Sequence, residues 1–254
     1  MARRRAIALS GLTAAVLVNY WIVAPIIGVD HDPGFSWISD LAARGEEGGW
    51  RFALLDGLSG LAVVAFGVLL WGELARPADD RAEVVDDPAR PAGDLSAVSQ
   101  PDISASGTAM TAAAGGSALR WGLVLLIASG ALAIADALLP VSCARSLGAG
   151  CVRTGDLIDE LHEIESALAV LATGAAMVLI GIGLRRRGAT GWLAALSVLA
   201  GAAFLLLSGL ISIRESVDAF NEYKGWLQRG GQLAFGVWLA AMAFASPPSA
   251  SSGG

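Results

Sequence analysis

The feature that most constrains this chain is a set of six apolar runs, each about as long as a bilayer is thick. A helix needs roughly 20 mostly apolar residues to cross the hydrocarbon core of a membrane. Inside hydrocarbon the backbone must satisfy its own hydrogen bonds, which a helix does. The predicted fold class is therefore all-α, a six-helix transmembrane bundle. The six predicted spans are residues 6–28, 52–74, 119–139, 164–184, 192–213 and 226–245.

Composition agrees with a membrane protein. Only 16% of the residues are charged and the mean hydropathy is +0.61, whereas soluble domains carry about 25% charged residues. The predicted partner is the lipid bilayer and the predicted location is the cell membrane, as a multi-pass protein. The sequence has no basic field of the kind that nucleic acid requires, so no nucleic-acid partner is expected. No protein partner can be read from the sequence.

The arginine distribution predicts the orientation. The triplets 3–5 and 185–187 flank predicted spans directly, and Lys and Arg close to a span favour the cytoplasmic side. Both termini are therefore predicted to be cytoplasmic, with residues 29–51 outside. The first apolar run is too long for the core of a signal peptide, and Pro25 follows Ala24 where cleavage would fall, so an uncleaved helix is expected.

The chain is expected to divide into four regions. Residues 75–118 are rich in Ala, Gly, Asp, Pro and Ser and have no aromatic residue, so this segment is expected to be a disordered cytoplasmic linker. The four regions are 1–74 (spans one and two with the outer loop 29–51), 75–118 (the linker), 119–246 (spans three to six) and 247–254 (a disordered tail).

Both cysteines lie in one short predicted outer loop. Cys143 and Cys151 are separated by seven residues, several of them small. In an oxidising compartment two neighbouring thiols usually pair. A structural disulfide is therefore predicted. Free thiols and a metal site are the alternatives, and a metal site would require more Cys or His ligands.

Ionisable residues gather at the outer ends of the predicted spans. Asp159, His162, Glu163 and Ser166 have the i, i+3, i+4, i+7 spacing of one helix face. Charge within a membrane usually faces the interior of a bundle, which predicts a shared polar pocket. A purely structural origin in helix-end polarity and ion pairs stays open. The predicted pocket residues are His31, Asp40, Asp56, Asp136, Asp159, His162, Ser166, Arg214 and Arg229.

The stretch HDPGFSWISDLAARGEEGGW (31–50) is predicted to fold back over this pocket as a lid. Pro33 and Gly34 would turn the chain, and Ser39 and Asp40 would supply acceptors. A buried Arg prefers a bidentate carboxylate. Arg229 is therefore expected to pair with an acid, and the candidates are Asp40, Asp136 and Glu165.

Sharper catalytic motifs are weak. The sequence HEIES has Ser166 where a zinc protease has its second His, so no metal is expected and any cofactor is unknown. A three-ligand site from His31, His162 and one of Asp40, Asp136 or Asp159 is a minor alternative. A Ser–His–Asp arrangement with His162 and Ser39 or Ser166 is another. The candidate catalytic residues are His162, Asp136, Asp40 and Ser39.

Several motifs together resemble one family. PGFSWISDLA at 33–42, Trp50, the Leu-Pro at 139–140 followed by His162, and GWLQR at 225–229 resemble the signature of the domain-of-unknown-function 998 family of bacterial multi-spanning membrane proteins. The resemblance implies an integral membrane protein with about six spans and no established activity. The sequence LLPVSC departs from the pattern, because an acid often follows the proline there.

Three function classes follow from these observations. The first, which is the prediction from the sequence, is a scaffold or accessory protein with a polar pocket on its outer face, and the other two are alternatives to it. The second is an intramembrane enzyme that acts on a lipid or lipid-linked group at the outer leaflet, with His162 as general base or metal ligand. The third is a small carrier, which is least supported because repeats and broken midplane helices are missing from the pattern. Convergence of the outer acids and histidines would favour the enzyme.

Overall fold

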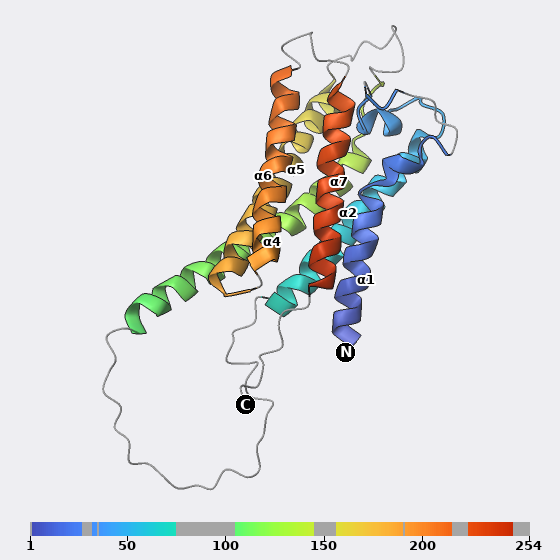
Figure 1. Cartoon of the computed structure of the whole chain (residues 1–254). Coiled ribbons are helices and arrows are strands. Elements are labelled where there is room, and N and C mark those ends of the chain that lie inside the picture. The colour runs from blue at the N-terminus through green and yellow to red at the C-terminus, as the bar shows by residue number, and fades with distance from the viewer. Residues whose placement is uncertain are drawn as a thin grey trace, which may run out of the picture.

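The computed structural model describes residues 2–26, 32–34, 36–74, 105–144, 156–189, 191–214 and 223–245, and only the backbone of 105–115 and 212–214. The regular secondary structure in these ranges is entirely helical, which confirms the all-α prediction (Figure 1). The helices are α1 (Ala2–Leu17), α2 (Gly49–Leu74), α4 (Ala105–Leu138), α5 (Leu157–Arg186), α6 (Gly191–Arg214) and α7 (Lys224–Phe244). Two short 3-10 helices, η1 (Tyr20–Val23) and η2 (Ser39–Ala42), lie between α1 and α2.

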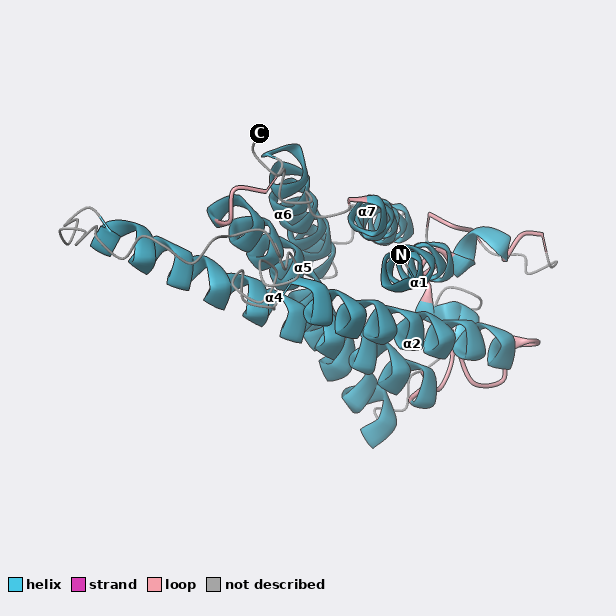
Figure 2. Cartoon of the chain, turned by 90° about the horizontal axis from the view of Figure 1, so that it is seen from below, coloured by secondary structure: helices cyan, strands magenta, loops and turns pink. Residues whose placement is uncertain are grey.

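The six helices form a closed ring. Each of them packs against its neighbours in the chain, and α7 packs back against α1. Seen along the bundle, α1, α2, α4, α5, α6 and α7 follow one another around the ring (Figure 2). The ring has an interior to which all six helices contribute, and polar side chains can lie there away from lipid.

Among the described residues, four helices are long and apolar enough to cross a membrane: Gly49–Leu74, Gly116–Leu138, Leu157–Arg186 and Gly191–Ile211. Large apolar side chains cover the outward faces, and Trp121 (62%), Leu199 (68%) and Leu206 (63%) are highly exposed, as expected for surfaces that contact lipid. α7 falls short of the same composition because Gln228, Arg229 and Gln232 occupy its first half. The chain is a multi-pass membrane protein.

The first predicted span, 6–28, is shorter as a helix than expected. α1 ends at Leu17, and the chain continues through a turn into η1. The Asn19 side chain donates a hydrogen bond to the Ala15 carbonyl oxygen at 2.9 Å, the kind of side-chain bond that competes with continuation of a helix. Residues 27–31 lie outside the described part of the chain.

The third predicted span begins earlier than expected. α4 starts at Ala105, so the end of the segment 75–118, which was predicted to be disordered, is helical. Alanine has the highest helix propensity, and this stretch contains TAMTAAA. The green start of α4 projects beyond the other helices in Figure 1. Residues 75–104 and 246–254 lie outside the described residues, so the disorder predicted for them stays a prediction.

α2 and α4 approach each other closely at paired glycines. A Cβ built on Gly60 would lie 2.5 Å from the Gly130 carbonyl oxygen, and a Cβ on Gly130 would lie 2.7 Å from the Gly60 carbonyl oxygen. Small residues at helix contacts let backbones approach in this way in membrane bundles. The close approach matters for the site below, because α2 and α4 both contribute acids to it.

The end of the bundle opposite the site is held by arginines. Arg3 of α1 lies 3.6 Å from the Glu73 carboxylate of α2, and Arg187 donates a hydrogen bond to the Leu74 carbonyl oxygen. The start of α1, the end of α2 and the end of α5 therefore meet at one end (Figure 1). Which side of the membrane this end faces stays a prediction.

Candidate functional site

The loop 32–44 lies across the end of the bundle that is formed by the start of α7, the end of α4 and the start of α5. Arg229, only 3% exposed, donates from Nη1 to the carbonyl oxygens of Pro33 and Ser36, both at 2.7 Å. Its Nη2 donates to Ser36 Oγ at 3.2 Å. These bonds fix Pro33 and Ser36 on the first turns of α7.

Two further bonds fix the loop to α7. The Ile38 amide donates to Gln228 Oε1 at 2.8 Å, and the Gly225 amide donates to the Gly34 carbonyl oxygen at 2.7 Å. A Cβ on Gly225 would lie 2.3 Å from the Pro33 carbonyl oxygen, so only glycine fits this crossing. The contacts agree with the prediction that the loop folds back over the bundle.

The prediction that a carboxylate binds Arg229 in a bidentate manner was wrong. Arg229 binds loop carbonyls, and Asp40 instead accepts a hydrogen bond from the Trp37 amide through Oδ2 at 3.0 Å. Asp40 is fully buried and close enough for its charge to attract Arg229. Backbone carbonyls take the place of the carboxylate, because the carbonyl oxygens of Pro33 and Ser36 both accept from the guanidinium.

The other edge of the loop is fixed to the segment after α4. Arg44 Nε donates to the Pro140 carbonyl oxygen at 2.8 Å, and the Arg44 amide donates to the Val141 carbonyl oxygen at 2.9 Å. The Arg44 guanidinium also lies 3.8 Å from the Asp156 carboxylate, the N-cap of α5. The loop is thus anchored on both sides of the ring.

Asp159, a predicted pocket residue, has a structural role. Its carboxylate accepts the Ser142 amide at 2.8 Å and the Ser142 hydroxyl at 2.6 Å, and it is 3% exposed. It therefore joins the first turn of α5 to the segment that follows α4, and the predicted pocket does not need it as a ligand-binding group.

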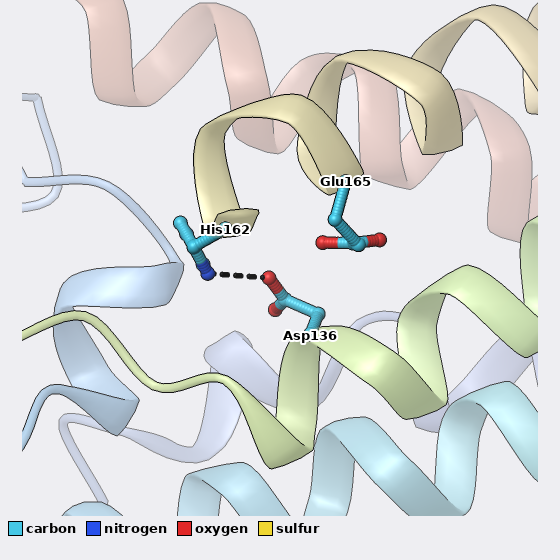
Figure 3. Close-up of side chains that lie close together, drawn as sticks. All are labelled: Asp136, His162 and Glu165. Atoms are coloured by element: carbon cyan, nitrogen blue, oxygen red, sulfur yellow. Dashed lines mark ion pairs between the residues drawn. The ribbon is translucent and has the colours of Figure 1, made fainter. Parts of the chain in front are cut away.

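Asp136 and His162 meet below the loop. His162 Nδ1 lies 2.9 Å from Asp136 Oδ1 and 3.1 Å from the Leu139 carbonyl oxygen. His162 is 5% exposed. Figure 3 shows the two side chains reaching each other from α4 and α5. These residues are two of the predicted catalytic candidates, and the structure brings them into direct contact.

Glu165 completes a cluster that the sequence predicted only in part. One ligand atom each from Asp136, His162 and Glu165 lies within 4.8 Å of the other two (Figure 3). Glu165 is 6% exposed, and neither of its carboxylate oxygens has a hydrogen-bond partner among the described residues. The sequence placed Glu163 on this face, but Glu163 is exposed. The i, i+3 spacing of His162 and Glu165 was the available signal.

Asp56 of α2 extends the cluster toward the interior of the ring. Its carboxyl group is close enough to Asp136 and Glu165 for their charges to interact. Asp56 also lines a cavity of about 100 Å³ inside the ring. The cavity has polar walls from Ser59, Ser129, Thr173 and Gln232, and Ile38 of the loop and Phe235 of α7 also line it. The loop therefore lies over both the cluster and the cavity.

For two of the remaining predicted site residues the structure gives no answer, because His31 and the Arg214 side chain lie outside the described residues. Ser39 is in η2 on the loop, and Ser166 is half-buried on α5. Cys143 is described, but Cys151 is not, so the predicted disulfide lies partly outside the described residues.

Comparison with known proteins gives one result. Residues 102–245 match a protein family that is described as "Protein of unknown function (DUF998)". This match confirms the resemblance seen in the sequence. No curated protein and no solved structure matches the chain.

Proposed function

Because the chain belongs to the DUF998 family, whose description assigns no activity, we propose a function from the site itself: the protein is a membrane-embedded enzyme that acts on a lipid or lipid-linked group at the end of the bundle covered by the loop 32–44. The observation that carries this proposal is the buried contact between Asp136 and His162. We propose that the protein is located in the cell membrane and that its substrate is a lipid or a lipid-linked group.

The chemistry follows from the pair. A carboxylate that holds an imidazole fixes the orientation of the ring and increases its basicity. His162 is proposed to activate a water or an acceptor hydroxyl, either directly or through a bound ion. Ionisable groups at membrane depth are energetically unfavourable and therefore usually mark a functional site. Asp56, Asp136, His162 and Glu165 lie close together on three helices that flank the interior of the ring. A scaffold role does not require them.

The loop has the position of a cover that must move. The cavity below it, about 100 Å³, is well below the ~300–1,000 Å³ of a typical small-molecule pocket. A lipid headgroup therefore needs the loop to open, as with the lids of many enzymes. The same small volume favours the second candidate, an accessory protein whose polar interior only supports the fold.

A comparison of lipid extracts distinguishes the two candidates. Cells that express wild type are expected to differ from cells that express His162→Gln in the amount of at least one lipid class, at matched protein levels in the membrane. Glu160→Gln is the matched control, because Glu160 lies on the same helix and is exposed, and its extract should equal that of wild type. Identical extracts from all three strains would reject the enzyme and leave the accessory role.

We also propose that the end with the loop faces outward and that both termini face the cytoplasm. The arginines Arg3 and Arg187 lie at the opposite end, which fits the preference of positive charge for the cytoplasmic side. In a chain without native cysteines, a membrane-impermeant thiol reagent should label Glu47→Cys and spare Ser96→Cys in intact cells. The reverse labelling pattern would invert the orientation.

The disulfide between Cys143 and Cys151 stays part of the proposal. An outer location would place both thiols in an oxidising compartment, where such pairs form. Peptide mass analysis without reductant should recover the two cysteines in one crosslinked peptide, which separates after reduction. Their removal should lower the free energy of unfolding by about 2–3 kcal/mol. Quantitative alkylation of both thiols before reduction would contradict the pairing.

A further inference from the structure

We propose that Asp136, His162 and Glu165 bind a divalent transition-metal ion inside the bundle. No metal was expected from the zinc-protease motif, because its second His is missing, and the three-ligand alternative considered above combined His162 with His31 and did not include Glu165. The ligand set instead forms from two helices, with Asp136 near the end of α4 and the other two residues near the start of α5.

The distances are those of neighbouring ligands around one ion. His162 Nδ1 lies 2.9 Å from Asp136 Oδ1 and 3.1 Å from the Leu139 carbonyl oxygen. Zinc and similar ions bind N and O atoms at ~2.0–2.2 Å, so adjacent ligands of an octahedral ion lie about 3 Å apart. A carboxylate oxygen of Glu165 lies within 4.8 Å of the ligand atoms of Asp136 and His162. A small rotation of the Glu165 side chain would let it bind the same ion.

Glu165 provides the independent argument for a cation. Its side chain is 6% exposed, and both of its oxygens lack a hydrogen-bond partner among the described residues. A buried carboxylate without a partner is strongly destabilising. The contact between Asp136 and His162 leaves this carboxylate without compensation, and the carboxyl group of Asp56 is a third acid close to the same place. A cation bound between Asp136, His162 and Glu165 would provide the missing partner for the Glu165 carboxylate.

The donor types select the class of ion. One imidazole nitrogen with carboxylate and carbonyl oxygens suits Zn²⁺, Mn²⁺, Fe²⁺ or Co²⁺, whereas Ca²⁺ and Mg²⁺ prefer oxygen alone. Three side-chain ligands leave a coordination position open, as in catalytic zinc sites. The site is argued from its ligands alone, and only its catalytic use rests on the function proposed above.

The test uses the full chain purified in detergent, stripped with a chelator and titrated with Zn²⁺ against a chromogenic competitor. Wild type should bind one Zn²⁺ per chain. Glu165→Gln and His162→Gln should each weaken binding by more than about 100-fold, because even groups that only support a ligand contribute ~10–100-fold. Glu160→Gln, an exposed acid on the same helix, should bind like wild type.

Co²⁺ gives a readout of ligand identity. The wild-type protein loaded with Co²⁺ should show d–d absorption bands that change in His162→Gln and stay unchanged in Glu160→Gln. Thermal unfolding of each apo variant shows whether it is folded, and an unfolded Glu165→Gln would be replaced by Glu165→Ala or by Asp136→Asn in the same titration. No stoichiometric Zn²⁺ in wild type, or equal affinity in all variants, would overturn the site.

The outcome separates this site from the enzyme proposal. Metal binding without any difference between the lipid extracts would keep the site and reject the lipid reaction. A lipid difference that depends on His162, without bound metal, would keep the enzyme and assign His162 to acid–base chemistry alone.

Discussion

Replacement of Arg229 by Gln should release the loop 32–44 from α7 and lower the free energy of unfolding by about 3 kcal/mol or more. Arg229 is 3% exposed and donates to the Pro33 carbonyl, the Ser36 carbonyl and the Ser36 hydroxyl. Gln offers one short amide in place of a guanidinium fork, so at least one buried carbonyl loses its donor. A buried acceptor without a donor destabilises a protein by ~1–3 kcal/mol.

Thermal and denaturant unfolding in detergent, with limited proteolysis of the loop, would measure this effect. Arg229→Lys should retain part of the stability, because Lys keeps the charge but loses the planar fork. Arg51→Gln is the matched control, since Arg51 is an exposed arginine near the same end of the bundle. Equal and small effects in all three variants would mean that Arg229 does not hold the loop.

Gly60→Ala and Gly130→Ala should each destabilise the bundle by about 3 kcal/mol, although alanine is the better helix former. The added methyl would lie 2.5 Å or 2.7 Å from a carbonyl oxygen of the facing helix, so α2 and α4 must move apart. Overpacking typically destabilises by ~1–3 kcal/mol, and the upper end applies here because the obstacle is backbone. The same movement would separate Asp56 from Asp136.

Gly57→Ala is the control on the same helix. A Cβ on Gly57 would meet only the Ala137 methyl at 3.4 Å, an ordinary contact. This variant gains helix propensity without a clash, so it should be neutral or more stable than wild type by up to ~1 kcal/mol. Equal stability of Gly57→Ala and Gly130→Ala would show that α2 and α4 do not cross at Gly60 and Gly130.

The sequence predicted the spans well where hydropathy alone decides them. The runs 52–74 and 192–213 lie entirely within α2 and α6. The sequence-based prediction failed where a polar side chain or helix propensity decides where a helix begins or ends. Examples are the end of α1 before Asn19 and the alanine-rich start of α4. A hydropathy window does not register either effect.

The site was predicted in position but not in composition. Asp136 and His162 were singled out because charge near a membrane is informative, and they do meet. Glu165 was considered only as an acceptor for Arg229, and Glu163 was placed on the inner face instead. Residues three and four positions apart both lie close to one face of a helix, so the spacing does not tell whether Glu163 or Glu165 faces the interior. The packing of α5 against α4 decides this, and the sequence alone does not reveal that packing.

The closed ring has a consequence for how the protein is made. Arg229 and Pro33 are 196 residues apart, so the loop emerges from the ribosome long before the helix that holds it. Until α7 is inserted, the acceptors of Pro33 and Ser36 must rely on water or on another protein. Completion of the cover is therefore one of the last steps of biogenesis, and nascent chains arrested before α7 should expose the loop to protease while the earlier helices are already in the membrane.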